Sequence, residues 1–208
     1  MFPPPMSIAT PQGRRREGPN RAWALPNILT YARVLAVPVV VALLFQPNEM
    51  WMRWTALGVF VVAGVTDFLD GWLARAWGQQ STMGRMLDPI ADKLLVAAVL
   101  LMLVADGTIT SWSVSAGIVI LCREILVSGL REFLAELKVS VPVSRVAKWK
   151  TTLQLVALGF LIAGRAGEKI LPGTTAIGLV LLWLAALLTL YTGWDYLKAG
   201  VTHMSDES

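Results

Sequence analysis

Long apolar runs, separated by short polar segments, fill most of the chain beyond residue 25. Pro and Gly interrupt any strand pattern, and the runs are too long for the core helices of a soluble protein. About 20 apolar residues in a helix suffice to cross the hydrocarbon of a bilayer. The pattern predicts an all-α integral membrane bundle with six spans, at Ile28–Phe45, Trp51–Trp77, Gly84–Val104, Trp112–Leu137, Arg145–Gly164 and Thr174–Leu197.

Polar ends frame these spans. Residues 1–20 are rich in Pro, Gly and Arg, a composition that predicts a disordered basic tail, and residues 201–208 form a short polar tail. Residues 21–200 then make one membrane domain. The first apolar run is not followed by a small-residue cleavage site, so no signal peptide is expected.

The distribution of Lys and Arg predicts the orientation of the bundle. Four arginines precede the first span, whereas the opposite side of the membrane receives few basic residues. Because cytoplasmic segments are enriched in Lys and Arg, we expect both termini in the cytoplasm. The four arginines are Arg14, Arg15, Arg16 and Arg21.

Composition supports a membrane protein and argues against a nucleic-acid partner. Of the 208 residues, 55% are hydrophobic and only 15% are charged, and the formal net charge is +4. In so apolar a chain, contact with the lipid bilayer and a phosphate-binding pocket explain the excess of basic residues better than nucleic acid does.

Four aspartates stand where the second span ends and the third begins. Asp67 and Asp70 are spaced i,i+3, Asp88 and Asp92 i,i+4, and the short link Gly78–Thr82 makes their helices antiparallel neighbours. The four carboxylates can therefore share one pocket, where they are expected to bind Mg²⁺ or Mn²⁺. Two such ions, roughly 3.5–4 Å apart, would clamp a diphosphate.

Small and polar residues surround this predicted metal pocket. Gly71, Ala74 and Gly84 leave room for a ligand, and Arg75 is placed to bind phosphate. In the first span, Asn27 and Thr30 are candidate ligands of a nucleotide or phosphate, although Asn27 fits helix capping equally well. We expect Arg33 to serve the pocket, because a buried arginine needs an anionic partner.

A second, basic cluster is predicted on the same side of the membrane, where it would bind a phosphate of the second substrate. Two alternatives stay open: ordinary enrichment of basic residues on the cytoplasmic side, and ion pairs with Glu124 and Glu132. The cluster consists of Arg123, Arg131, Lys148 and Lys150.

The spacing of the acidic stretch resembles a known family signature. It reads Asp67-x2-Asp70-Gly71-x2-Ala74-Arg75-x8-Gly84-x3-Asp88-x3-Asp92 and is similar to the signature of the CDP-alcohol phosphotransferases. Within that family, the stretch from Pro26 to Gln154 resembles bacterial phosphatidylglycerophosphate synthases.

The resemblance implies a reaction and roles for the aspartates. The hydroxyl of sn-glycerol 3-phosphate would attack the β-phosphorus of CDP-diacylglycerol, and CMP would leave. Asp67, Asp70 and Asp88 would hold two metal ions with help from Asp92, which would also be the general base. The resemblance further implies a homodimer, and the expected location is the bacterial inner membrane. The distribution of Lys and Arg predicts that the site faces the cytoplasm.

Other functions share part of this pattern. Phosphatidylinositol-phosphate, phosphatidylserine and cardiolipin synthases would keep the aspartates and differ in the basic cluster. An intramembrane prenyltransferase would need an Asn-x3-Asp motif, which Asp67-x2-Asp70 does not fit. A divalent-cation transporter, the non-enzymatic alternative, would need ligands near the middle of the bilayer rather than toward one face.

Overall fold

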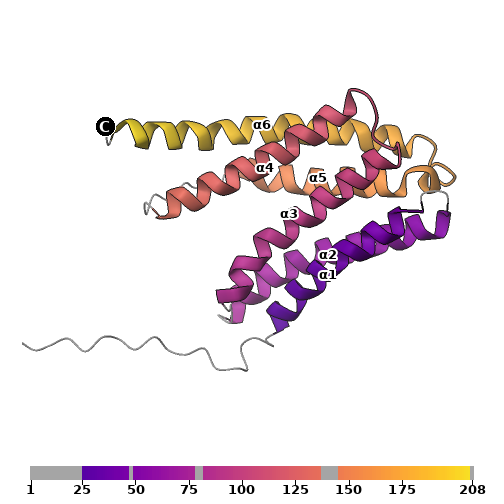
Figure 1. Cartoon of the computed structure of the whole chain (residues 1–208), viewed down its shortest axis with the longest axis horizontal. Helices are drawn as coiled ribbons and strands as arrows, with labels where there is room; N and C mark the ends of the chain where they lie inside the picture. The colour runs from indigo at the N-terminus through magenta and orange to yellow at the C-terminus, as the bar shows by residue number, and fades with distance from the viewer. Residues whose placement is uncertain (1–24, 47–48, 78–81, 137–144, 207–208) are drawn as a thin grey trace, which may run out of the picture.

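A computed structural model describes residues 25–46, 49–77, 82–136 and 145–206. Over these residues the chain forms six helices that run up and down the bundle, with their connections at its two ends (Figure 1). The helices are α1 (Leu25–Leu44), α2 (Met50–Trp77), α3 (Thr82–Ala105), α4 (Ser113–Glu136), α5 (Arg145–Gly167) and α6 (Thr174–Asp206).

The predicted all-α fold is confirmed, and each helix matches one predicted span closely except at the end of α6. This helix continues past Leu197 to Asp206, because hydropathy marks where a span ends and not where the helical hydrogen bonding stops. The predicted disordered tail at residues 1–20 and the loop at residues 138–144 lie outside the described residues.

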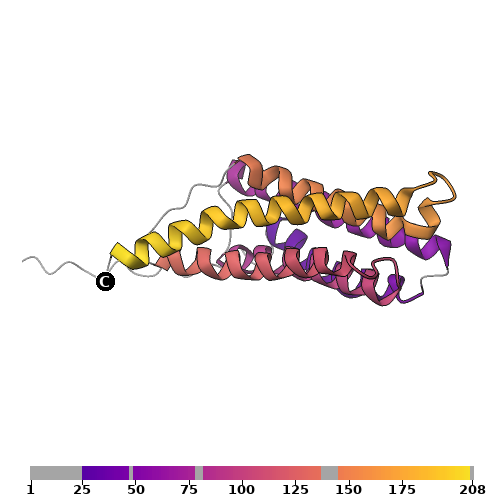
Figure 2. The ribbon, with the colours of Figure 1, turned by 90° about the horizontal axis from the view of Figure 1, so that it is seen from above.

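Packing among the helices is uneven. Helix α5 packs along both α6 and α2, α1 packs against α2 and α3, and α4 packs mainly against α6 (Figures 1 and 2). Helices α3 and α4 touch each other only sparsely. The buried core contains Phe60, Val99, Ile120, Leu158 and Leu182. A packed apolar core thus holds the bundle together, while α3 and α4 leave a cleft between them.

Large apolar side chains also cover the outside of the bundle. Leu35, Leu101, Ile125 and Leu187 are each more than half exposed, as expected for side chains that face lipid rather than water. Within the described residues, Ser113–Leu134 and Thr174–Trp194 are long and apolar enough to cross a bilayer, and Ile28–Leu44 is apolar but shorter. Of the remaining helices, α2 and α5 carry charged side chains toward both ends, and α3 carries them toward its start.

A buried arginine joins three elements at the end of the bundle opposite the aspartates. Arg53 of α2 forms an ion pair with Asp106 in the α3–α4 turn, and the exposed fractions of the two side chains are 1% and 3%. It also donates hydrogen bonds to Thr108 and to the carbonyl oxygens of Leu161 and Ile162 in α5. The sequence pattern places Arg53 with Arg165 and Lys169 among the few basic residues opposite the cytoplasmic side, and it gives no sign of this network.

The side chain of Glu168 caps the N-terminus of α6 at the same end of the bundle. Its Oε1 accepts a hydrogen bond from the backbone N–H of Thr175, and its Oε2 accepts one from that of Gly173, both at 2.7 Å. These N–H groups have no partner within the helix, so the carboxylate satisfies them and meets the positive end of the helix dipole. The two bonds, that of Thr175 first, lower the pKa of Glu168 below its usual range.

Replacing Glu168 by Gln should make the stability of the protein less sensitive to acid. Because the folded-state pKa of Glu168 is lowered, its carboxylate stabilises the fold above the ordinary carboxyl pKa of about 4.3, and this contribution is lost as the pH falls through the lowered value. Thermal unfolding in detergent between about pH 7 and about pH 3 should therefore show a smaller acid-induced fall in Tm for the variant. Parallel Tm profiles for the two proteins would contradict this role.

Candidate active site

Three helices bring polar side chains together at one end of the bundle. Helix α2 carries Asp67 toward its C-terminal end, and α3 carries Asp88 and Asp92 near its start. Helix α1, which packs against both, contributes Thr30 and Arg33 from its first turns. The up-and-down order of the helices places all these turns at the same end (Figure 1).

The carboxylates of α2 and α3 are each held by a side chain from α1. The Nη1 atom of Arg33 lies 2.6 Å from Oδ1 of Asp67, and Arg33 is 1% exposed, whereas Asp67 is 47% exposed. The hydroxyl of Thr30, also buried, donates a hydrogen bond to Asp88. Arg33 is thus the buried cation that offsets the charge of Asp67, and the other face of the Asp67 carboxylate stays open to a ligand.

Asp92 lies about one helical turn beyond Asp88 and lines a different space. This cleft, about 440 Å³ in volume, lies between α3, α4 and α5. Next to Asp92, the ammonium group of Lys93 donates a hydrogen bond to Ser128 of α4. Sequence reasoning assigned no role to Lys93 or Ser128, although Lys93 directly follows the acidic motif.

Two members of the predicted basic cluster belong to one network around Glu124. Arg123 turns toward α6, where its Nε donates to the carbonyl oxygen of Thr189 at 3.1 Å and its Nη2 to Oγ1 of Thr192 at 3.0 Å.

The Nη1 atom of Arg123 lies 3.2 Å from Oε1 of Glu124, which also accepts a hydrogen bond from the ammonium group of Lys150. The ion pair between Arg123 and Glu124, left open from the sequence, is therefore present, and Arg131 lies exposed farther along α4.

The other predicted site residues lie in helices whose backbone is described but whose side chains are not. They fall in the first turn of α1, the last turns of α2, and the first turns of α3 and α5. All these turns lie at the end of the bundle that holds Asp67. The residues are Asn27, Asp70, Gly71, Ala74, Arg75, Gly84 and Lys148.

The carboxylates suit a hard divalent cation by their chemistry. Asp67, Asp88 and Asp92 offer only oxygen ligands, which Mg²⁺ and Mn²⁺ prefer. Among the side chains that the structure describes, no three acidic, histidine or cysteine groups are close enough together to form a metal site. Asp70, the fourth predicted ligand, is outside that set. The donor atoms thus fit such an ion, while a two-metal site stays a prediction.

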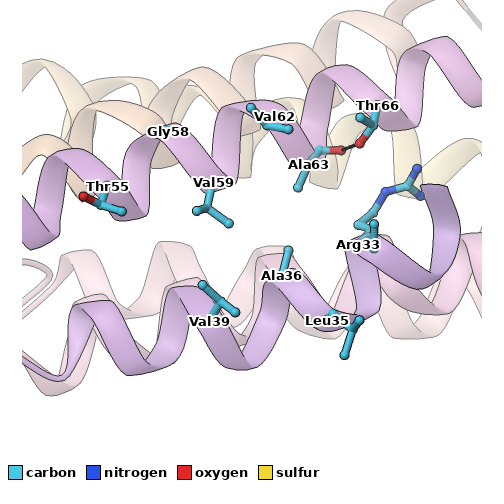
Figure 3. A pocket seen from close by; sticks show the side chains of 11 residues that line it. Arg33, Leu35, Ala36, Val39, Thr55, Gly58, Val59, Val62, Ala63 and Thr66 are labelled. Atoms are coloured by element: carbon cyan, nitrogen blue, oxygen red, sulfur yellow. Dashed lines mark hydrogen bonds between the residues drawn. The ribbon is translucent and has the colours of Figure 1, made fainter. Parts of the chain in front are cut away.

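An apolar groove about 630 Å³ in volume runs between α1 and α2. Figure 3 shows Arg33 and Thr66 at one end of it and Thr55 toward the other, with small or branched apolar side chains between them. Since Arg33 pairs with Asp67, the groove begins beside the carboxylates. The sequence does not predict this groove; the one signal that could have indicated it is the presence of small residues in both facing helices, which include Ala32, Ala36, Gly58 and Ala63.

Comparison with known proteins identifies the family to which this arrangement belongs. A family model described as CDP-alcohol phosphatidyltransferase matches residues 23–191. The chain is 48% identical to a CDP-diacylglycerol–glycerol-3-phosphate 3-phosphatidyltransferase of Rickettsia typhi, over 86% of this chain and 98% of the relative. It is 38% identical to proteins of the same name from Cereibacter sphaeroides (89% and 99%) and Haemophilus influenzae (88% and 96%). The chain therefore belongs to the CDP-alcohol phosphatidyltransferase family.

Proposed function

We propose that the chain is a CDP-diacylglycerol–glycerol-3-phosphate 3-phosphatidyltransferase, which transfers the phosphatidyl group to sn-glycerol 3-phosphate and releases CMP. The observation that carries this proposal is similarity over nearly the whole length of relatives with that name, at 38–48% identity. The acidic end of α2 and the start of α3 supply a site of the right chemistry.

Members of this family use divalent metal ions. Asp67, Asp70 and Asp88, with help from Asp92, would hold two Mg²⁺ or Mn²⁺ ions, which supply positive charge to the diphosphate when bound. Arg33 and Thr30 position the carboxylates of Asp67 and Asp88 from α1. The CDP part would lie against Asn27, Thr30, Gly71, Ala74, Arg75 and Gly84.

Asp92 acts on the second substrate in this proposal. Its carboxylate takes the proton from the reacting hydroxyl of glycerol 3-phosphate while that oxygen bonds to the β-phosphorus of CDP-diacylglycerol. The bond from this phosphorus to the bridging oxygen breaks, and CMP leaves with that oxygen. The position of Asp92 in the cleft between α3, α4 and α5 supports this role, because the cleft gives the carboxylate a neighbouring space for a small alcohol.

The phosphate of the acceptor would be bound by Arg123, Arg131, Lys148 and Lys150. Arg123 and Lys150 share Glu124 in the described structure, so the acceptor phosphate would compete with this carboxylate for both cations. Such an exchange keeps the two cations paired before and after binding, which limits the cost of burying them.

The membrane arrangement follows from the same reasoning. We propose six spans within a single domain at residues 21–200, with the tails at residues 1–20 and 201–208 and the active site all on the cytoplasmic side. The bacterial inner membrane is the expected location, and a homodimer the expected assembly. The lipid-facing apolar surface and the helices that are long and apolar enough to cross a bilayer support the membrane-spanning part of this arrangement.

The proposed activity is tested by CMP release from the purified protein in detergent with Mg²⁺, CDP-diacylglycerol and one acceptor at a time. Release with glycerol 3-phosphate alone is the expected result. Release only with inositol phosphate, serine or phosphatidylglycerol would instead assign the chain to another activity of the family. Absence of release with all of these acceptors would favour the divalent-cation transporter.

We also propose that one acyl chain of CDP-diacylglycerol occupies the groove between α1 and α2. From Thr55 to Thr66 the groove follows about 16 Å of helix, at about 1.5 Å per residue, close to half of the roughly 30 Å hydrocarbon thickness. The groove therefore matches the depth of the leaflet in which the substrate lies, and it begins where the headgroup is needed.

Filling this groove should weaken binding of the lipid substrate. A Cβ atom at Gly58 meets no other heavy atom within 4 Å, so Gly58→Ala is a mild control and Gly58→Phe projects a ring into the groove. We expect Gly58→Phe to raise the KM for CDP-diacylglycerol about tenfold, with the KM for glycerol 3-phosphate unchanged. Equal changes in both KM values, or none in either, would contradict the assignment of the groove.

A further inference from the structure

Gln154 of α5 is a buried polar residue that has no role in the reaction as proposed above. Its side chain is 4% exposed and lines the same cleft as Asp92. Among the described residues, its Oε1 atom has no hydrogen-bond donor. Buried polar atoms in folded proteins nearly always have a partner, so an amide oxygen left over in a cleft beside a candidate general base indicates a ligand that donates a hydrogen bond.

The surroundings of Gln154 narrow the chemistry of that ligand. Lys150, one helical turn earlier in α5, is paired with Glu124, and Lys93 donates to Ser128. The ammonium group of Lys93, which lines the cleft, and that of Lys150, which contacts the cleft residue Glu124, therefore each bind a protein oxygen. A phosphate oxygen carries no proton to donate to Oε1 of Gln154, whereas an alcohol hydroxyl does.

We propose that Oε1 of Gln154 accepts a hydrogen bond from the second, unreactive hydroxyl of the acceptor, on the carbon next to the one whose oxygen attacks. This inference rests on the proposed function, because it takes glycerol 3-phosphate as the acceptor and Asp92 as the base. Gln154 then determines specificity: it selects a polyol phosphate and turns the reacting hydroxyl toward Asp92. The carboxylate of Asp92 and the amide oxygen of Gln154, which line the same cleft, together would recognise a pair of adjacent hydroxyl groups.

The test compares two acceptors that differ only in that hydroxyl, sn-glycerol 3-phosphate and 3-hydroxypropyl phosphate. CMP release gives kcat/KM for each acceptor with the wild-type protein, with Gln154→Met and with Gln154→Glu. Met has nearly the same volume and no acceptor oxygen, whereas Glu keeps a carboxyl oxygen in either protonation state. A buried group left unpaired by the missing hydroxyl is expected to cost the wild-type protein about tenfold or more with the deoxy acceptor.

We expect Gln154→Met to remove most of this preference by slowing the reaction with glycerol 3-phosphate, and Gln154→Glu to retain the preference even if both rates fall. A wild-type protein without preference between the acceptors would overturn the inference, and this comparison does not depend on any variant folding. Equal slowing of both acceptors by Gln154→Met would also overturn it, because a purely structural role affects both alike. Absence of CMP release with glycerol 3-phosphate from the wild-type protein would instead overturn the proposed function, and with it this inference.

Discussion

Asp92→Asn should lower the rate of CMP release by a factor of about 10² to 10⁴, the range expected for loss of a general base. The amide has the same shape as the carboxylate and cannot take the proton of the acceptor hydroxyl. Asp67 and Asp88, two of the three main metal ligands in the proposal, keep their contacts with Arg33 and Thr30. Binding of CDP-diacylglycerol should therefore be largely retained. Turnover and equilibrium binding of the lipid, measured on the same preparation, check both parts.

Glu132→Gln is the matched control for this variant. Glu132 lines the same cleft as Asp92 but lies exposed on α4, so removing its charge should leave kcat close to that of the wild-type protein. A near-normal rate for Asp92→Asn would contradict the assignment of the base. A similar loss in both variants would point instead to the overall negative charge of the cleft.

Arg53→Met should produce the largest loss of stability. It leaves the buried carboxylate of Asp106 without its cation and removes a donor from the carbonyl oxygens of Leu161 and Ile162. Breaking a buried ion pair by removing one partner typically costs about 3–5 kcal/mol, which corresponds to a fall in Tm on the order of 10 °C for a chain of this size. Thermal unfolding in detergent measures the shift.

Two further variants show whether the buried pair itself is responsible. Replacing both partners, in Arg53→Met with Asp106→Leu, should recover part of the lost Tm, because no unpaired charge then stays buried. Lys169→Met, at an exposed cation of the same end, should leave Tm unchanged. An unchanged Tm for Arg53→Met would show that the pair contributes nothing to stability.

The sequence predicted the helices well because apolar runs and polar breaks follow directly from the cost of placing a polar backbone in lipid. It also predicted that Arg33 would serve the acidic pocket, since a buried arginine needs an anion, and the structure pairs it with Asp67. The sequence did not predict that the side chain of Arg123 points toward α6. Helix α4 is apolar on most sides, so its pattern does not tell which face meets α6.

Contacts between distant segments were the other limit. Arg53 and Asp106 are charged residues of separate predicted segments, and the packing of the bundle brings Arg53 of α2 to Asp106 in the α3–α4 turn and to the carbonyl oxygens of Leu161 and Ile162 in α5. The sequence also gave little indication that Gln154 belongs to the site. Gln154 lines a cleft that exists because α3 and α4 touch each other only sparsely, and the spacing of residues along the chain does not predict how far apart two helices lie.

The groove and the cleft approach the carboxylates between different pairs of helices, α1 with α2 and α3 with α4. If the lipid occupies the groove and the acceptor the cleft, as proposed, both can be bound at once, and transfer needs no covalent intermediate that carries the phosphatidyl group. We therefore expect sequential kinetics, in which both substrates are bound in a ternary complex before CMP is released. The lipid can stay in the bilayer throughout, while the water-soluble partner exchanges on its own timescale.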